Sequence, residues 1–295
     1  MQEDIRHITQ KNINRKKYDA CIENAINSRA YALSWYLDVT TSSWDVLVYQ
    51  DYKAVMPVPF LRSLRFLLVK QVIQPPFCQQ LGVFYEEELG PKLMTAFYKA
   101  LLNFNPKSYS FNSQNTLFFQ SKISELQPKK NFELVLNKPY KELYNSFSTN
   151  TKRNLKKALK QAFSITTSCS IEDLIRLKKT NKKHQLNKNV YEKMRQLSSE
   201  IITHNSGEFV GVLYQNELVA IHLYIKTKQR IILLLTASND YGKQHGASVF
   251  LNNHLIEKQA NTELILDFEG SMIPGIARFF KSFGAKNIPY LLYKS

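Results

Sequence analysis

Two carboxylates near the C-terminus have a spacing that suits proton transfer or amine binding. Asp267 and Glu269 stand two residues apart at the end of Leu264–Phe268, a run typical of a buried strand. Residues two apart on a strand project from one face, and strand ends border the ligand cleft of open α/β sheets. A carboxylate there can hold an acceptor amine or remove its proton. The alternative is that both carboxylates cap the loop and helix that follow.

A basic pair lies on the next predicted helix, Ile273–Phe283, where Arg278 and Lys281 are three residues apart and share one side. Lys281 can stabilise negative charge that develops on an acyl oxygen, although a solvated surface lysine is the plainer interpretation. The expected apolar stripe of this helix consists of Ile273, Ile276, Ala277 and Phe280.

A glycine-containing segment before another predicted helix has the character of a phosphate-binding loop. Backbone N–H groups at a helix start, bared by Gly246, bind phosphates with help from the helix dipole. An ordinary loop glycine before a helix remains the alternative. The residues predicted to hold a cofactor there are Lys243, His245, Gly246, Ala247 and Ser248, together with Leu235, Thr236 and Ala237 on the preceding strand.

A third candidate is the basic face of a predicted helix over Asn150–Phe163. At about 100° per residue its cations fall within one arc, opposite an apolar side. Such a face can grip phosphates, with Lys152 and Arg153 as the expected substrate contacts, or it can simply be the wet side of the helix. The cations are Lys152, Arg153, Lys156, Lys157 and Lys160. Among the histidines, His222 lies inside a predicted strand and can face the cleft, but a structural role is favoured.

The elements that must position these residues are legible in the second half of the chain. Three β-rich runs separated by short polar turns predict an antiparallel meander. A loop, a helix, a strand, a helix and a last strand follow. The expected ranges are Glu208–Tyr214, Leu218–Ile225 and Ile231–Thr236 for the meander, then Ala237–Gly246, Ala247–Ala260, Leu264–Phe268, Ile273–Phe283 and Ile288–Tyr293.

The first half predicts a separate compact α/β unit. It has a helical segment at Ile13–Asp38, a hairpin formed by Asp45–Gln50 and Lys53–Val58, and a helix at Leu89–Leu102. The polar stretch Asn112–Lys130 is the best candidate for the connection. We therefore expect an α/β fold with mixed sheets, in two domains that cover residues 1–130 and 131–295.

Composition narrows the possible partners. The chain has 295 residues, 44% of them apolar, which is enough to bury a core in each domain. Its net charge of +16 favours a phosphate- or carboxylate-rich partner, although a solubilising lysine-rich surface explains it equally well. No apolar run approaches the roughly 20 residues that span a bilayer. Three scattered cysteines predict neither a disulfide framework nor a zinc site, and no metal-ligand spacing occurs, so we expect a cytoplasmic protein without a metal.

Two motifs resemble those of a known family. The segment Leu266–Ser271 followed by Arg278–Gly284 is similar to the D-F-x-G … F-K-x-x-F-G ending of FemABX-type peptidyl transferases. Thr151–Ala158 resembles the R-N-(L/I)-x-K-A helix that opens their second domain, and Lys243–Ser248 resembles the phosphate loop of GNAT acyltransferases. The segments Tyr31–Asp38 and Gln74–Gly82 also resemble uncharacterised bacterial relatives of the Bacteroidetes type. The resemblance implies two tandem GNAT-like domains.

The same resemblance implies the chemistry. We expect transfer of an acyl group from an activated donor, first of all acetyl- or another acyl-coenzyme A, to the amine of a small molecule or peptide, with Asp267, Glu269 and Lys281 as catalytic residues and Arg278 near the substrate. A FemABX-type transfer from aminoacyl-tRNA to a cell-wall precursor is the first alternative. A basic nucleic-acid-binding protein without activity is the second, because a fold does not fix a function.

Overall fold

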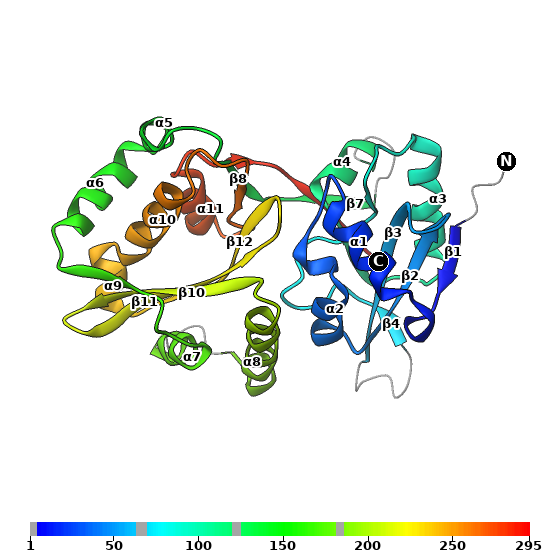
Figure 1. The fold of residues 1–295 in the computed structure, drawn as a ribbon, viewed down its shortest axis with the longest axis horizontal. Coiled ribbons are helices and arrows are strands. Elements are labelled where there is room, and N and C mark those ends of the chain that lie inside the picture. Colours follow the sequence, from blue (N-terminus) through cyan, green and yellow to red (C-terminus); the bar gives the residue numbers. More distant parts are fainter. Residues whose placement is uncertain (1–4, 63–69, 120–124, 181–185) are drawn as a thin grey trace. The chain divides into compact units, whose positions relative to one another are not determined.

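The computed structural model describes residues 5–62, 70–119, 125–180 and 186–295, and the chain divides into two compact units (Figure 1). Unit 1 comprises residues 1–130 and 288–295, and unit 2 comprises residues 131–287. The predicted α/β class with mixed sheets is confirmed. The division differs from the expected one at the C-terminus. The last strand, β15, lies between β6 and β7 of unit 1, because it pairs with both of them.

Unit 1 contains a five-stranded sheet in the order β1-β2-β3-β4, with β5 also paired to β3, and a three-stranded sheet in the order β6-β15-β7. The expected hairpin is β2–β3, whereas the single expected helical segment Ile13–Asp38 is divided into α1, a 3-10 turn and α2. Its strands are β1 (Ile5–Ile8), β2 (Ser43–Tyr49), β3 (Ala54–Arg62), β4 (Lys70–Val72), β5 (Phe84–Tyr85), β6 (Ser108–Phe111), β7 (Leu126–Lys129) and β15 (Tyr290–Lys294). Its helices are α1 (Arg15–Asn24), α2 (Ser34–Thr40), α3 (Pro91–Leu102) and α4 (Ser113–Phe119), with 3-10 turns at Gln10–Asn12 and Ala30–Ala32.

Unit 2 is built on a seven-stranded sheet in the order β14-β8-β13-β12-β11-β10-β9. The meander β10–β11–β12 is antiparallel as predicted, whereas β12 and β13 run parallel. Its strands are β8 (Phe132–Val135), β9 (Phe163–Thr166), β10 (Gly207–Tyr214), β11 (Glu217–Lys226), β12 (Arg230–Ser238), β13 (Ile265–Asp267) and β14 (Lys286–Asn287). Its helices are α5 (Tyr140–Asn145), α6 (Thr149–Leu159), α7 (Ile171–Thr180), α8 (Lys188–Thr203), α9 (Asp240–His245), α10 (Ala247–Lys258) and α11 (Pro274–Lys281).

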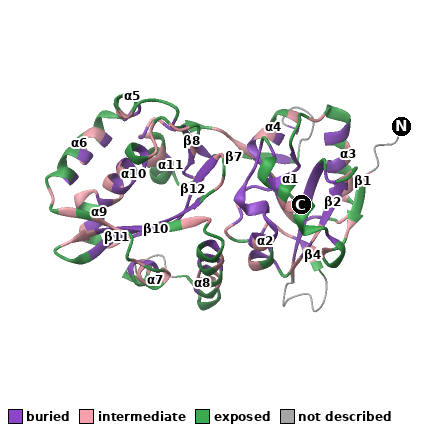
Figure 2. Ribbon diagram, in the orientation of Figure 1, coloured by how far each residue is buried: buried purple, intermediate pink, exposed green. Residues whose placement is uncertain are grey.

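Helices cover both faces of the unit 2 sheet (Figure 1). Helix α10 packs on β10 and β11 from one side, with α6 against α10, while α7 and α8 pack on the other side. Alternate side chains of β11 point to opposite faces of the sheet, and those of Ala220 and Tyr224 belong to the apolar cluster beneath α10. The strands of the meander are buried along most of their length, whereas α6 and α8 keep exposed outer surfaces (Figure 2).

Local sequence explains how the helices that border the site begin and end. Ser148 caps α6 by accepting a hydrogen bond from the Thr151 N–H. Pro274 occupies the first turn of α11, where its missing N–H costs nothing. Gly284 follows α11 with a φ of +83°, the left-handed conformation expected of a residue just beyond a helix end.

Three local expectations were wrong. The segment Ala237–Gly246, expected to be a loop, contains the helix α9, which its N-cap Asn239 starts by accepting from the Gly242 N–H. Helix α11 is shorter than expected. Two members of its expected apolar stripe, Ile273 and Ile276, are 59% and 41% exposed, because Ile273 precedes the helix and Ile276 lies in its first turn, whereas Ala277 is buried.

Candidate active site

The sheet of unit 2 opens between β12 and β13. The two strands pair only at Arg230–Ile232 with Ile265–Asp267, although β12 continues to Ser238. A β-bulge falls where this pairing ends, because the register with β11 skips Leu234. In the part of the chain that the structure describes, no strand covers this edge of β12 beyond Ile232. An extended ligand can therefore reach backbone N–H and C=O groups there.

The predicted donor-binding residues of β12 lie on this open edge. Thr236 is exposed, whereas the side chains of Leu235 and Ala237 are 7% and 8% exposed. Leu235 and Ala237 can therefore contact a donor through their backbone groups rather than through their side chains.

The predicted phosphate loop is a helix junction that α6 covers. Gly246 joins α9 to α10 with a φ of +79°, and no side chain caps α10. A Cβ at Gly246 would lie 3.5 Å from the Ala158 Cβ and 3.5 Å from the Asn154 carbonyl oxygen, so α6 closely approaches the start of α10. The Lys157 Nζ also donates to the Gln244 carbonyl oxygen at 3.2 Å.

The side chains of this junction are engaged within the protein. Lys243 pairs with Asp240 at 3.1 Å, and the His245 ring stacks on Tyr241 with centroids 4.2 Å apart. Ala247 is fully buried, and the Ser248 hydroxyl lies 2.9 Å from that of Ser238 at the end of β12. The side chains of Lys243 and Ser248 thus have partners within the protein, whereas the His245 Nδ1 has none among the described residues.

A cavity of about 580 Å³ lies between the start of α6 and α11. Hydroxyl groups join the two helices at its wall, since Thr151 Oγ1 donates to Ser282 Oγ at 2.6 Å and lies 3.1 Å from Ser148 Oγ. Val249 of α10 also lines it and directly follows Ser248. Through Val249 the cavity reaches the first turn of α10, where Ser248 contacts Ser238 at the end of β12.

The predicted cations Arg278 and Lys281 both line this cavity and are exposed. Neither side chain makes a hydrogen bond or ion pair with any residue that the structure describes. No carboxylate occurs among the described residues that line the cavity. Two unneutralised cations beside a helix start suit a phosphate or a developing oxyanion.

The other predicted substrate contacts lie on α6 beside this cavity. The Lys152 Nζ donates to the Asn145 carbonyl oxygen at 2.8 Å and lies 5.4 Å from the centre of the Tyr144 ring. Arg153 donates to the side chain of Asn150, which lines the cavity, at 2.7 Å. Arg153 is thus tied to the wall of the cavity, whereas Lys152 is held at the turn before α6.

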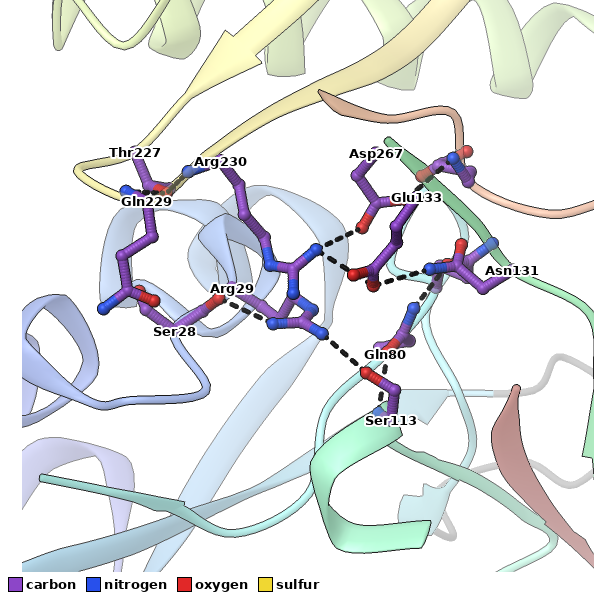
Figure 3. A network of polar contacts seen from close by, with 12 residues as sticks. Ser28, Arg29, Gln80, Ser113, Asn131, Glu133, Thr227, Gln229, Arg230 and Asp267 are labelled. Atoms are coloured by element: carbon purple, nitrogen blue, oxygen red, sulfur yellow. Dashed lines mark hydrogen bonds and ion pairs between the residues drawn. The ribbon is translucent and has the colours of Figure 1, made fainter. Parts of the chain in front are cut away.

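The two predicted carboxylates have different environments. Asp267 is fully buried, and the Arg230 Nη1 lies 3.3 Å from its Oδ2 and 2.9 Å from the Glu133 Oε1 (Figure 3). Asp267 Oδ1 also accepts from the Glu269 N–H at 2.9 Å. An amine cannot reach a carboxylate enclosed in this way, so the contacts of Asp267 suit a structural role.

Glu269 is half-buried and has a φ of +57°, in the left-handed region that few residues other than glycine adopt. Its N–H is bound by Asp267, and its carbonyl oxygen accepts from the Phe132 N–H at 2.9 Å. Such backbone strain costs about 1–3 kcal/mol and persists only where neighbours enforce it. Asp267 therefore holds Glu269 in place just beyond the end of β13.

His222 and Tyr224 form a buried polar pair on β11. The His222 Nδ1 lies 2.8 Å from the Tyr224 hydroxyl, and the two residues are 1% and 3% exposed. Burial lowers the pKa of His222 to about 3, so the ring is neutral near pH 7. Burial likewise raises the pKa of Tyr224 well above its usual value.

Sequence reasoning missed the hydroxyl cluster of Ser148, Thr151 and Ser282. Its only signals were a capping serine before α6 and a serine at the end of α11, separated by more than a hundred residues.

In the described ranges, no group of three histidine, cysteine, aspartate or glutamate side chains is arranged to hold a metal ion. Within the same ranges, no helix combines the length and apolar character of a bilayer span.

No protein-family model matches the sequence, and no curated protein matches it. Solved structures do match over nearly the whole chain. FemX superposes with a TM-score of 0.68 at 11% identity and covers 96% of each chain. A conserved protein of unknown function from Bacteroides thetaiotaomicron VPI-5482 gives a TM-score of 0.62 at 8% identity over 99% of each chain. A tandem GNAT protein from the clavulanic acid biosynthesis pathway gives 0.55 at 8% identity, over 98% of this chain and 97% of that one.

These likenesses confirm the predicted architecture. The chain has the tandem GNAT-like fold of the FemABX-related proteins.

Proposed function

We propose that unit 2 transfers an aminoacyl or acyl group from a phosphate-bearing donor to an amine. The observation that carries this proposal is the cavity between α6 and α11, where Arg278 and Lys281 are unneutralised and Val249 of α10 also forms part of the lining. The cavity suits the phosphates of the donor, and the strand edge suits its extended acyl arm. FemX and the tandem GNAT protein share this fold, which supports a transferase without fixing the donor.

The chemistry needs positioning, a proton acceptor and charge stabilisation. In our proposal the amine nitrogen attacks the donor carbonyl carbon, and the Lys281 ammonium stabilises the oxyanion that forms. The bond to the leaving oxygen or sulfur then breaks as the amide forms. Glu269 takes the proton of the amine, directly or through water, and the proton then passes to the leaving oxygen or sulfur. Asp267 acts only through the backbone of Glu269 and is a positioning residue.

Aminoacyl-tRNA is the donor that we favour. Helix α6 approaches the start of α10, where the pyrophosphate of coenzyme A would bind, and hydrogen bonds engage Gln244 and Ser248 there. The outer face of the same helix adds exposed cations, among them Lys156 and Lys160, that can follow a nucleic-acid backbone. The FemABX resemblance implies a cell-wall precursor as the amine acceptor.

Acyl-coenzyme A is the second candidate, and one observation favours it. The bulge of β12 at Leu234 and the open edge beyond it are suited to an extended arm that carries amide groups. The tandem GNAT structure is described as lacking AcCoA, which names acetyl-coenzyme A as a ligand of that protein.

Thermal stability separates these donors. A ligand that binds only the folded state raises the midpoint of unfolding by mass action. We expect total aminoacyl-tRNA to raise the midpoint at low salt, and less so at high salt. A shift with acetyl- or longer acyl-coenzyme A that survives added salt would instead make coenzyme A the donor. Binding of deacylated tRNA as tight as that of the charged form, without transfer, would support a nucleic-acid-binding protein and contradict the enzyme.

A further inference from the structure

Three polar side chains lie in the otherwise apolar layer between α10 and the sheet of unit 2. His222 and Tyr224 project from β11 into the cluster that contains Ala220, Val210 and Leu233. Asn252 enters the same layer from α10. The proposed transfer step uses none of these three residues.

Asn252 is fully buried, yet neither its Nδ2 nor its Oδ1 has a hydrogen-bond partner among the residues that the structure describes. An amide buried in this way loses its hydrogen bonds to water and gains none in return, which costs free energy. Leucine has nearly the same shape and would avoid that cost. An unpaired amide at this position therefore indicates something that it binds.

His222 offers a second hydrogen-bonding atom to the same layer. Its Nδ1 is taken by the Tyr224 hydroxyl, and its Nε2 has no partner in the described part of the chain. The ring is neutral, so between its two nitrogens it carries one donor and one acceptor.

Two contacts fix the level of Asn252 along the sheet. The Ser248 hydroxyl meets Ser238, which pairs with Ala220 of β11. Further along α10, Leu255 lines a cavity of about 210 Å³ together with Tyr224. Helix α10 therefore follows β11 from the level of Ala220 to that of Tyr224.

His222 and Asn252 fall midway between these two contacts. Asn252 is four helical residues beyond Ser248, about 6 Å along the axis, and shares its face. His222 is two strand residues beyond Ala220, about 7 Å along β11. The two unpaired groups are thus level with each other, one on each side of the layer.

The open strand edge gives access to this level. Thr236 of β12 pairs with His222, so both side chains lie on the same face, and Thr236 is exposed. It belongs to the part of β12 that β13 leaves uncovered. A ligand extended along that edge passes beside His222.

We propose that His222 and Asn252 select the acyl group, by binding an uncharged hydrogen-bonding side chain on the aminoacyl part of the donor. This inference rests on the proposed transfer activity and names its substrate class. A threonyl, seryl or asparaginyl group supplies the donor and acceptor that the two residues lack. An apolar group of the same shape leaves both unpaired, and a charged group must be stripped of water without a counter-ion.

The test compares donors equal in shape, using stable 3′-aminoacylamino-adenosine analogues for binding and charged tRNA for transfer. Wild-type protein should bind the threonyl analogue at least about tenfold more tightly than the valyl analogue, with the same preference in transfer. Asn252→Leu should remove that preference by weakening threonyl binding alone. Its unfolding midpoint should equal or exceed that of the wild type. His222→Phe should act in the same direction.

Three results would overturn the inference. Equal binding of the two analogues by wild-type protein would show that His222 and Asn252 do not distinguish the aminoacyl side chains. An unchanged preference in Asn252→Leu would mean that Asn252 holds a buried water only. An equal loss for both analogues would mean that the substitution damages the fold. Transfer without a threonyl preference refutes only this inference, whereas absence of both binding and transfer refutes the proposed function as well.

Discussion

Arg230 carries its charge into the interior of unit 2, where the carboxylates of Glu133 and Asp267 lie beside its Nη1. The three side chains are 2%, 8% and 0% exposed. Removing one partner from such a group leaves buried charge uncompensated. The sequence shows three charged residues far apart in the chain, and only the parallel pairing of β12 with β13 brings Arg230 close to Asp267.

We predict that Arg230→Met lowers the free energy of unfolding by about 3–5 kcal/mol. Arg278→Met, at an exposed cation without an ion pair, should change it by less than about 0.5 kcal/mol. Denaturant titration of both variants measures the difference. Equal stability of the two variants would mean that the buried group contributes nothing to the fold.

His222 gives a prediction for acid stability. Its folded pKa of about 3 lies below the usual histidine pKa of 6.5, so the unfolded chain takes up a proton at pH values where the folded protein does not. Stability is therefore unaffected by this group above about pH 6.5, and it decreases as the pH falls from there towards 3. The slope for one such group is at most about 1.4 kcal/mol per pH unit.

The measurement is the difference in unfolding free energy between wild type and His222→Gln from pH 8 to pH 4.5. We expect a constant difference above about pH 7 and a progressive loss of wild-type stability relative to the variant below about pH 6.5. A difference that does not change with pH would show that His222 is protonated equally in both states.

At the scale of elements, α6 both covers the start of α10 and forms one wall of the cavity. Its cap, Ser148, also lies beside Thr151 and bonds through its N–H to the Ser282 carbonyl oxygen. The residues that start α6 therefore also line the cavity, and losing the cap should weaken binding of the donor.

We predict that Ser148→Ala destabilises the protein by about 0.5–2 kcal/mol and also weakens donor binding. Asn187 is the matched control, because it caps α8 through the Val190 N–H outside this cavity. Asn187→Ala should cost similar stability and leave donor affinity unchanged. If both variants bind the donor as wild type does, the cavity is not the donor site.

The elements also show what the sequence could predict. The meander has alternating runs and short polar turns, so β10, β11 and β12 could be placed closely. Helix α9 is six residues long, too short to show a helical period, so the sequence predicts a loop there. Strand β15 was recognised as a strand, but its own pattern does not say which sheet it joins. Spacing alone places Ile273 in the core, because it cannot show that α11 begins only at Pro274 and leaves its first turn exposed.

The candidate site was likewise predicted only in part. Arg278 and Lys281 were singled out, and both line the cavity. The sequence offers a catalytic or a capping role for Asp267 and gives no sign of the buried, unpaired amide of Asn252. Both side chains acquire their roles from residues that are distant in the sequence.

At the scale of the whole molecule, the net charge of +16 would strengthen binding of the proposed nucleic-acid donor. Each phosphate contact releases counterions, so affinity falls with salt in proportion to the number of contacts. We predict that Lys156→Gln with Lys160→Gln on α6 lowers the slope of log affinity for tRNA against log salt by about 1–2. Titrations at several salt concentrations measure that slope, and an unchanged slope would place the tRNA away from α6.

The central claim is tested most directly by transfer from charged total tRNA to a peptide with a lysine side-chain amine, measured as amide formed per protein. Lys286→Met is the control, because Lys286 is an exposed lysine of unit 2 that does not line the cavity. We predict transfer by wild type and by Lys286→Met, and a loss of about 100-fold or more in Lys281→Met with an unchanged unfolding midpoint. Transfer by Lys281→Met at the wild-type rate, or no transfer by wild type from either tRNA or coenzyme A donors, would contradict the account.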